Sequence, residues 1–112
     1  MDINFNKNED HNKLLVSELN KRLARVSLGG GKSRIEKLHS KGKMTARERI
    51  NYVLDAKAKS IEIAAFAGED MYAAHGGCPS GGVVVKMGYI KGKQCIVVAN
   101  DATVKAGAWF PI

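Results

Sequence analysis

Cysteine and proline are scarce in this sequence of 112 residues, with two of each, and aromatic residues make up only 6%. Two cysteines are too few for the disulfide framework of a small secreted domain. The residues after Met1 are polar and do not form the apolar core of a secretion signal. No apolar run approaches the roughly 20 residues that cross a membrane. We therefore expect a cytoplasmic protein with reduced thiols and no membrane partner.

Acidic residues are scarce in one segment. Residues 21–49 contain ten basic side chains but only Glu36 and Glu48, so this segment carries +8 while the whole chain carries +7. Such a patch favours an anionic partner, which would be nucleic acid, acidic lipid or a phosphorylated small molecule. A solvated helix face has the same composition. The ten residues are Lys21, Arg22, Arg25, Lys32, Arg34, Lys37, Lys41, Lys43, Arg47 and Arg49.

The first half of the chain shows helical patterns. Residues 1–10 are polar and predict a disordered tail. Leucine and valine recur at helical spacing over 11–27, with Asp10 as the expected N-cap. Ser33 with Glu36, and Thr45 with Glu48, fit the capping-box pattern, which predicts two further short helices. We therefore expect a basic helical section over residues 11–59.

The second half, residues 60–112, shows strand patterns. We expect strands at 60–66, 82–90 and 94–99, with a tight turn at Lys91-Gly92 joining the last two into an antiparallel hairpin. A long loop over 68–82 lies between the first strand and this hairpin. The chain stops at Trp109-Phe110-Pro111-Ile112, which is apolar where most C-termini are polar. These features predict an α/β domain that is truncated.

Three motifs contain residue types that occur in chemical sites. Gly29-Gly30-Gly31-Lys32-Ser33 looks like the end of a phosphate-binding loop, but Val26 stands where that loop needs its first glycine. His75, Cys78 and Cys95 lack the paired spacing of four zinc ligands. A nucleophilic pair of Cys78 and His75 lacks a third, orienting residue. We therefore predict no catalytic residue and no metal site.

The basic helices allow a second functional interpretation. Residues 35–40 and 45–54, joined by a turn at 41–43, could form a helix-turn-helix unit that binds DNA phosphates. The first helix is short, and Asn51 is the one amide side chain placed to read bases. A small basic nucleic-acid-binding protein remains the alternative function, although nucleic acid is not the expected partner.

Three segments carry a family resemblance. They are Gly42-Lys43-Met44-Thr45-Ala46-Arg47-Glu48-Arg49-Ile50, then His75-Gly76-Gly77-Cys78-Pro79-Ser80-Gly81-Gly82-Val83-Val84, and then residues 99–112, from Ala99-Asn100-Asp101-Ala102-Thr103 to Phe110-Pro111-Ile112. In this order they resemble the N-terminal part of the carboxyltransferase (beta) subunit of biotin-dependent acyl-CoA carboxylases. The similarity is greatest to the methylcrotonoyl-CoA type. Because subunits of this family are several-fold longer, the chain alone is expected to be inactive.

The resemblance implies a crotonase-like fold of stacked ββα units behind a helical N-terminal section. It also implies an acyl-CoA substrate, biotin carried on a biotin carboxylase or carrier subunit, and a homo-oligomer in the full-length form. Under this resemblance, Lys43 and Arg47 are candidates to meet the coenzyme A phosphates. Gly76, Gly77, Gly81 and Gly82 are expected in a loop near the active site. Their amides could face an anion, or these glycines could only shape turns.

Overall fold

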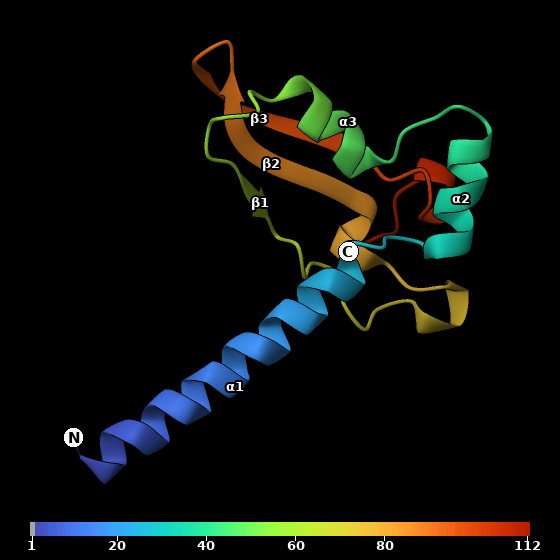
Figure 1. Ribbon diagram of the computed structural model, residues 1–112. Helices are drawn as coiled ribbons and strands as arrows, with labels where there is room; N and C mark the ends of the chain where they lie inside the picture. Colours follow the sequence, from blue (N-terminus) through green and yellow to red (C-terminus); the bar gives the residue numbers. More distant parts are fainter. Residues whose placement is uncertain (1) are drawn as a thin grey trace.

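The computed structural model describes residues 2–112 and combines three helices with one small sheet (Figure 1). The mixed α/β architecture predicted from the sequence is present. Short 3-10 turns lie at Ala73–His75, Pro79–Gly82 and Lys105–Gly107. The helices are α1 (Ile3–Val26), α2 (Lys32–Ser40) and α3 (Ala46–Val53), and the strands are β1 (Ile61–Ile63), β2 (Val83–Ile90) and β3 (Lys93–Asn100).

The sheet is antiparallel, in the order β1-β2-β3. β2 and β3 form the predicted hairpin, in which Ile90 pairs with Lys93 across a two-residue turn. Both turn residues have positive φ, 50° at Lys91 and 78° at Gly92, as a two-residue type I′ hairpin turn requires. The carboxylate of Asp55 accepts hydrogen bonds from both turn amides, at 2.8 and 2.9 Å. β1 is shorter than the strand predicted over 60–66.

The core lies between α3 and one face of the sheet. Ile50 on α3 and Val84 on β2 are almost fully buried, with Ala46, Leu54 and Ala99 around them. Gly88 faces this layer, and a Cβ at that position would stand 2.9 Å from both methyl carbons of Leu54. The absence of a side chain at Gly88 therefore lets Leu54 pack directly on the sheet.

The opposite face of the sheet is apolar and exposed. The register brings Ile61 against Met87 and Val85 against Val98 on this face. One end of this face, with Val85 and Val98, forms a mostly apolar groove of about 360 Å³ together with Trp109, Phe110 and Ile112. Within residues 2–112, no helix packs against this face. The large exposed side chains on it are Ile61, Ile63, Ile96 and Val98.

Helix α1 begins much earlier than predicted. It starts at Ile3, and Asp2 caps it by accepting the amide of Asn4 at 3.1 Å. The predictions of a tail over 1–10 and of an N-cap at Asp10 are therefore wrong, apart from Met1, which lies outside the described residues. Residues 3–10 contain no glycine or proline to stop a helix, and Glu9 pairs with Lys13 at 3.0 Å one turn on.

The two predicted capping boxes have different outcomes. At α3, Thr45 accepts the amide of Glu48 and Glu48 accepts the amide of Thr45, so that box is confirmed. At α2 the N-cap is Gly31 and it makes no side-chain hydrogen bond. Ser33 lies inside the helix, because the helix starts at Lys32, and so the box predicted there is wrong. Within residues 2–112, no helix combines the length and apolar character needed to span a bilayer.

Candidate functional site: a basic cleft between helix α2 and the turn after β3

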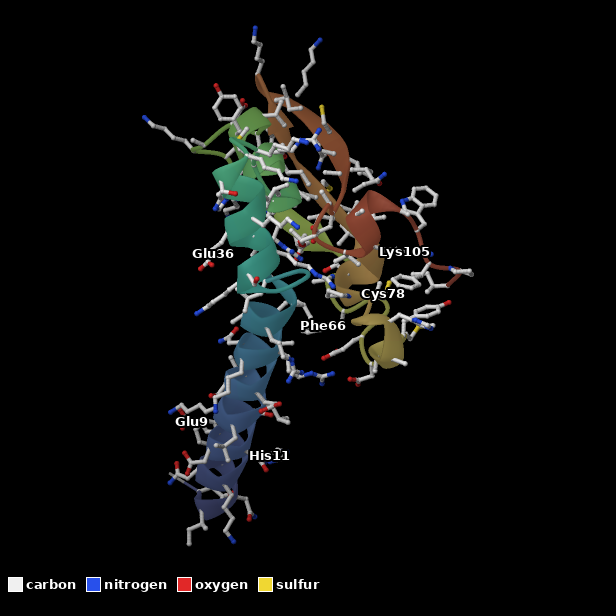
Figure 2. All side chains as sticks on the ribbon, turned by 90° about the vertical axis from the view of Figure 1, so that its right-hand side faces the viewer. Glu9, His11, Glu36, Phe66, Cys78 and Lys105 are labelled. Carbon is white, nitrogen blue, oxygen red and sulfur yellow. The ribbon has the colours of Figure 1, made fainter. Side chains whose placement is uncertain are left out.

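Four cationic side chains surround one hollow of about 520 Å³. Arg34, Lys37 and Lys41 come from α2, and Lys105 comes from the turn after β3. Figure 1 shows this red turn beside α2. No carboxylate lines the hollow among the residues described. Figure 2 shows the carboxylate of Glu36 on the side of α2 away from Lys105. We call this hollow the basic cleft; its charge suits an anionic ligand.

A polar network fixes the two walls of the basic cleft. The buried hydroxyl of Thr103 accepts the amide of Gly30 at 2.9 Å and donates to the carboxylate of Asp101 at 2.6 Å. Arg34 donates to the carbonyl of Thr103 at 3.0 Å. A Cβ at Gly30 would collide with that same carbonyl, so the chain before α2 approaches this strand end closely. The network holds α2 against the turn that carries Lys105.

The glycine-rich loop is closed by its own backbone. All four predicted glycines have positive φ, between 65° and 90°. The amide of Gly77 donates to the carbonyl of Tyr72 at 2.9 Å, and that of Gly76 to Ala73 at 3.2 Å. The amide of Gly81 donates to the carbonyl of Ala67 at 2.7 Å. These three N–H groups are used within the loop, which favours a structural role for these glycines over anion binding. That this loop lies near an active site stays a prediction.

Arg47 crosslinks three parts of the chain. Its guanidinium pairs with Glu62 on β1 at 2.9 Å, and both side chains are less than one-fifth exposed. It also donates to the hydroxyl of Ser80 at 2.9 Å and to the carbonyl of Ser27 at 3.4 Å. The sequence did not predict this role. Lys43 is exposed in the turn after α2. The structure does not bring Lys43 or Arg47 into the lining of the basic cleft.

Cys78 lies on the buried side of the glycine-rich loop. Burial raises the pKa of its thiol, which keeps it protonated and weakly reactive. Its carbonyl accepts a hydrogen bond from Gly81, and a Cβ at Gly68 would collide with that carbonyl. The neighbouring His75 is exposed at the end of a 3-10 turn. Cys78 therefore acts as a small packing residue in the folded chain.

Sequence reasoning missed the basic cleft as a site, although one signal was available. Arg34, Lys37 and Lys41 stand at i, i+3 and i+7, which places them on one face of a helix. Lys105 and Thr103 belong to the third segment that carries the family resemblance, where they had no role. Only the tertiary structure brings this segment to α2.

Known proteins match the region of the chain that contains these segments. The family model described as "Carboxyl transferase domain" matches residues 37–112. This region includes most of the basic cleft and all three segments of the resemblance. The match spans more than half of the chain, and the chain belongs to the carboxyl transferase domain family. The predicted membership is confirmed.

Two curated relatives illustrate the similarity. The probable methylcrotonoyl-CoA carboxylase beta chain of Drosophila melanogaster, described as mitochondrial, is 45% identical over 88% of this chain. The biotin-dependent 3-methylcrotonyl-coenzyme A carboxylase beta1 subunit of Mycobacterium tuberculosis is 39% identical over 92%. This chain spans only 17% and 19% of their respective lengths.

Solved structures agree with the fold. The beta subunit of P. aeruginosa geranyl-CoA carboxylase matches 97% of this chain with a TM-score of 0.77 and 28% identity. Transcarboxylase 12S, solved as a hexamer with methylmalonyl-coenzyme A and methylmalonic acid bound, matches 83% with a TM-score of 0.73 and 35% identity. The chain covers 20% and 18% of those chains. For the part that it spans, the predicted crotonase-like α/β fold is confirmed.

Proposed function

We propose that this chain forms part of the carboxyltransferase subunit of a biotin-dependent acyl-CoA carboxylase, of the methylcrotonoyl-CoA type. The reaction of the whole subunit would move a carboxyl group from carboxybiotin to the acyl-CoA. The observation that carries the proposal is the basic cleft, most of whose lining lies within residues 37–112, the region that matches the family. The names of the similar carboxylases support the substrate class.

The chemistry of coenzyme A fits the basic cleft. The nucleotide end of coenzyme A carries a 3′-phosphate and a pyrophosphate, and phosphate oxygens bind arginine and lysine through charge-assisted hydrogen bonds. Lys37 and Lys41 offer ammonium groups from α2, and Arg34 offers a planar guanidinium, one nitrogen of which already donates to the carbonyl of Thr103. Lys105 adds positive charge to the opposite wall, where its ammonium donates to the carbonyl of Trp109 at 3.2 Å. We propose that these four residues hold the phosphates and leave the thioester to the rest of the subunit.

The roles predicted for Lys43 and Arg47 remain proposals. Lys43 is exposed in the turn that follows Lys41, so its ammonium could extend the basic surface. Arg47 suits the role less well, because Glu62 and Ser80 already bind its guanidinium. We therefore assign the phosphates first to the basic cleft.

The glycine-rich loop does not offer the amides of Gly76, Gly77 and Gly81 to biotin. Stabilising a ureido oxygen needs backbone amides that aim at it, and the amides of Gly76, Gly77 and Gly81 are used inside their loop. We therefore propose that biotin arrives on a separate carrier or biotin carboxylase subunit. A homo-oligomeric full-length subunit fits the hexamer named for transcarboxylase 12S. Cytoplasmic location stays a prediction.

A titration of the purified chain with coenzyme A tests the phosphate role. The double variant Lys37→Ala/Lys41→Ala should weaken binding at least about tenfold, because two charge-assisted contacts are lost. Lys57→Ala/Lys59→Ala removes two exposed lysines outside the basic cleft and is the matched control, with less than about a twofold effect. Dephospho-coenzyme A, which lacks the 3′-phosphate, should bind more weakly than coenzyme A. Equal affinities of both double variants would contradict the proposal.

The nucleic-acid alternative predicts a different result. Family membership gives it no support. Tight binding of a duplex oligonucleotide that falls steeply with salt, without competition by coenzyme A, would favour this alternative.

A further inference from the structure

Helix α1 projects away from the rest of the fold with an apolar stripe that, from Phe5 to Leu19, is exposed among the described residues. Figure 1 shows its N-terminal end far from the sheet, and Figure 2 shows Glu9 and His11 on this projecting part. At 100° per residue, the stripe spans about a third of the helix circumference. Its apolar members are Phe5, Leu15, Val16, Leu19, Leu23 and Val26. Val26 is buried in the body of the fold, while the first four are about half exposed.

The two halves of α1 carry opposite charge. Over residues 2–12, Asp2, Glu9 and Asp10 outnumber Lys7, which leaves −2. Over residues 13–26, four basic side chains outnumber Glu18, which leaves +3; the basic residues are Lys13, Lys21, Arg22 and Arg25. Arg22 and Arg25 both pair with Glu69, and with that carboxylate counted this half still carries +2. The helix is therefore electrostatically polar along its length.

We propose that α1 pairs with α1 of a second copy of this chain in an antiparallel, two-fold symmetric contact. Antiparallel pairing sets the acidic half of each helix against the basic half of the other, whereas parallel pairing opposes like charges. It also buries Phe5, Val16 and Leu19 from both copies in one seam. A two-fold contact uses the same surface twice, so it closes as a dimer.

The shape of the chain permits this pairing. The body of the fold lies at the C-terminal end of α1 (Figure 1), so antiparallel helices place the two bodies at opposite ends of the seam. Val26 is the only buried residue of this 24-residue helix, so the rest of its apolar stripe is available to pack against a second copy. The proposal is independent of the acyl-CoA assignment, because no residue of the stripe lines the basic cleft.

Analytical ultracentrifugation of the full chain tests the pairing, with a matched pair of variants. Leu19→Glu places a charge in the stripe and should raise the dimer dissociation constant at least about tenfold. Leu14→Glu makes the same change at a leucine that is 70% exposed on the other side of the helix, and should change it less than about twofold. Circular dichroism of each variant shows that the helix is retained. A chain that stays monomeric at high concentration, or equal effects of the two variants, would overturn the proposal.

Salt and oxidation test the orientation. Lower ionic strength should strengthen an antiparallel dimer, because it strengthens the attraction between opposite halves. In a Cys95→Ser background, Asn8→Cys lies near the end of α1 and should not form a disulfide-linked dimer, since antiparallel pairing holds the two ends apart. Ready crosslinking at this position would overturn the antiparallel assignment. A dimer that Val98→Lys dissociates and Leu19→Glu does not would place the contact on the sheet and overturn the proposal.

Discussion

Thr103 gives both of its hydrogens to one carboxylate oxygen of Asp101, its backbone N–H at 2.9 Å and its hydroxyl at 2.6 Å. Both side chains are buried. Because the same hydroxyl accepts the amide of Gly30, the pair joins the end of β3 to the segment that leads into α2. This hydroxyl group therefore links the two walls of the basic cleft, beside the bond from Arg34 to the carbonyl of Thr103.

Thr103→Val removes this hydroxyl at nearly constant volume. The amide of Gly30 and the carboxylate of Asp101 would each lose a partner in a buried site, so we expect a loss of about 1–3 kcal/mol in the free energy of unfolding. Thr103→Ser keeps the hydroxyl and should lose less. Urea denaturation of both variants measures the difference, and equal losses would contradict the role given to the hydroxyl.

The guanidinium of Arg47 holds Glu62 and Ser80 at the same time, which a single ammonium cannot do in the same geometry. We expect Arg47→Lys to cost about 1–2 kcal/mol of stability, because Glu62 lies in a mostly buried position. Arg49→Lys, at an exposed position on the same helix, is the control and should change stability by less than about 0.5 kcal/mol. Thermal unfolding with indistinguishable results for both variants would show that the crosslink carries no stability.

The two capping patterns can be compared directly. Thr45→Ala breaks an observed capping box and should cost about 1 kcal/mol. Ser33→Ala changes the residue that fits the same pattern but caps nothing in the structure, and should cost less than about 0.5 kcal/mol. Equal costs, measured by chemical denaturation, would mean that Ser33 caps α2 after all.

Glu69 predicts a dependence of stability on pH. Its hydrogen bond with Arg22, at 2.6 Å, is the main cause that lowers the pKa of its carboxyl in the folded chain. A lowered folded pKa means that this ion pair stabilises the fold above the ordinary glutamate pKa and loses that effect as pH falls. The stability difference between the natural chain and Glu69→Gln should therefore shrink below about pH 4.3. A difference that stays constant from pH 7 to pH 3 would contradict this assignment, and Glu36→Gln serves as an exposed control.

The open face of the sheet should bind hydrophobic dyes. Ile96→Thr and Val98→Thr keep a β-branched shape on this exposed face, so dye fluorescence should fall while stability changes by less than about 0.5 kcal/mol. Val84→Thr puts the same hydroxyl into the core and should cost about 1–3 kcal/mol. Unchanged fluorescence in the two exposed variants would place the dye elsewhere, for example on α1.

Local signals predicted the hairpin and one helix start well. Lys91-Gly92 lies between two strand-forming runs and adopts the tight turn predicted there. Thr45 caps α3, as its spacing to Glu48 indicates. The same spacing failed at Ser33, because a capping pattern does not fix which residue begins the helix. The failure at Asp10 has a similar cause, since a polar segment without a breaker can extend a helix.

Long-range contacts account for what the sequence did not predict. Arg47 meets partners 15 and 33 positions away, and Gly30 meets Thr103 across 73 positions. No periodicity along the chain encodes such pairs. The helical spacing of Arg34, Lys37 and Lys41 could have revealed one wall of the basic cleft, but not the wall that carries Lys105.

The position of the core divides the molecule into parts of unequal stability. Its buried apolar side chains come from α3 and the hairpin, between Ala46 and Ala99, while α1 contributes only Val26 from its last turn to the buried residues. Backbone amides near the start of α1 can therefore exchange with solvent by local opening, without unfolding of the sheet. The exchange rate of those amides therefore reports the local stability of the helix, including its contact with a second copy, and not the global free energy of unfolding.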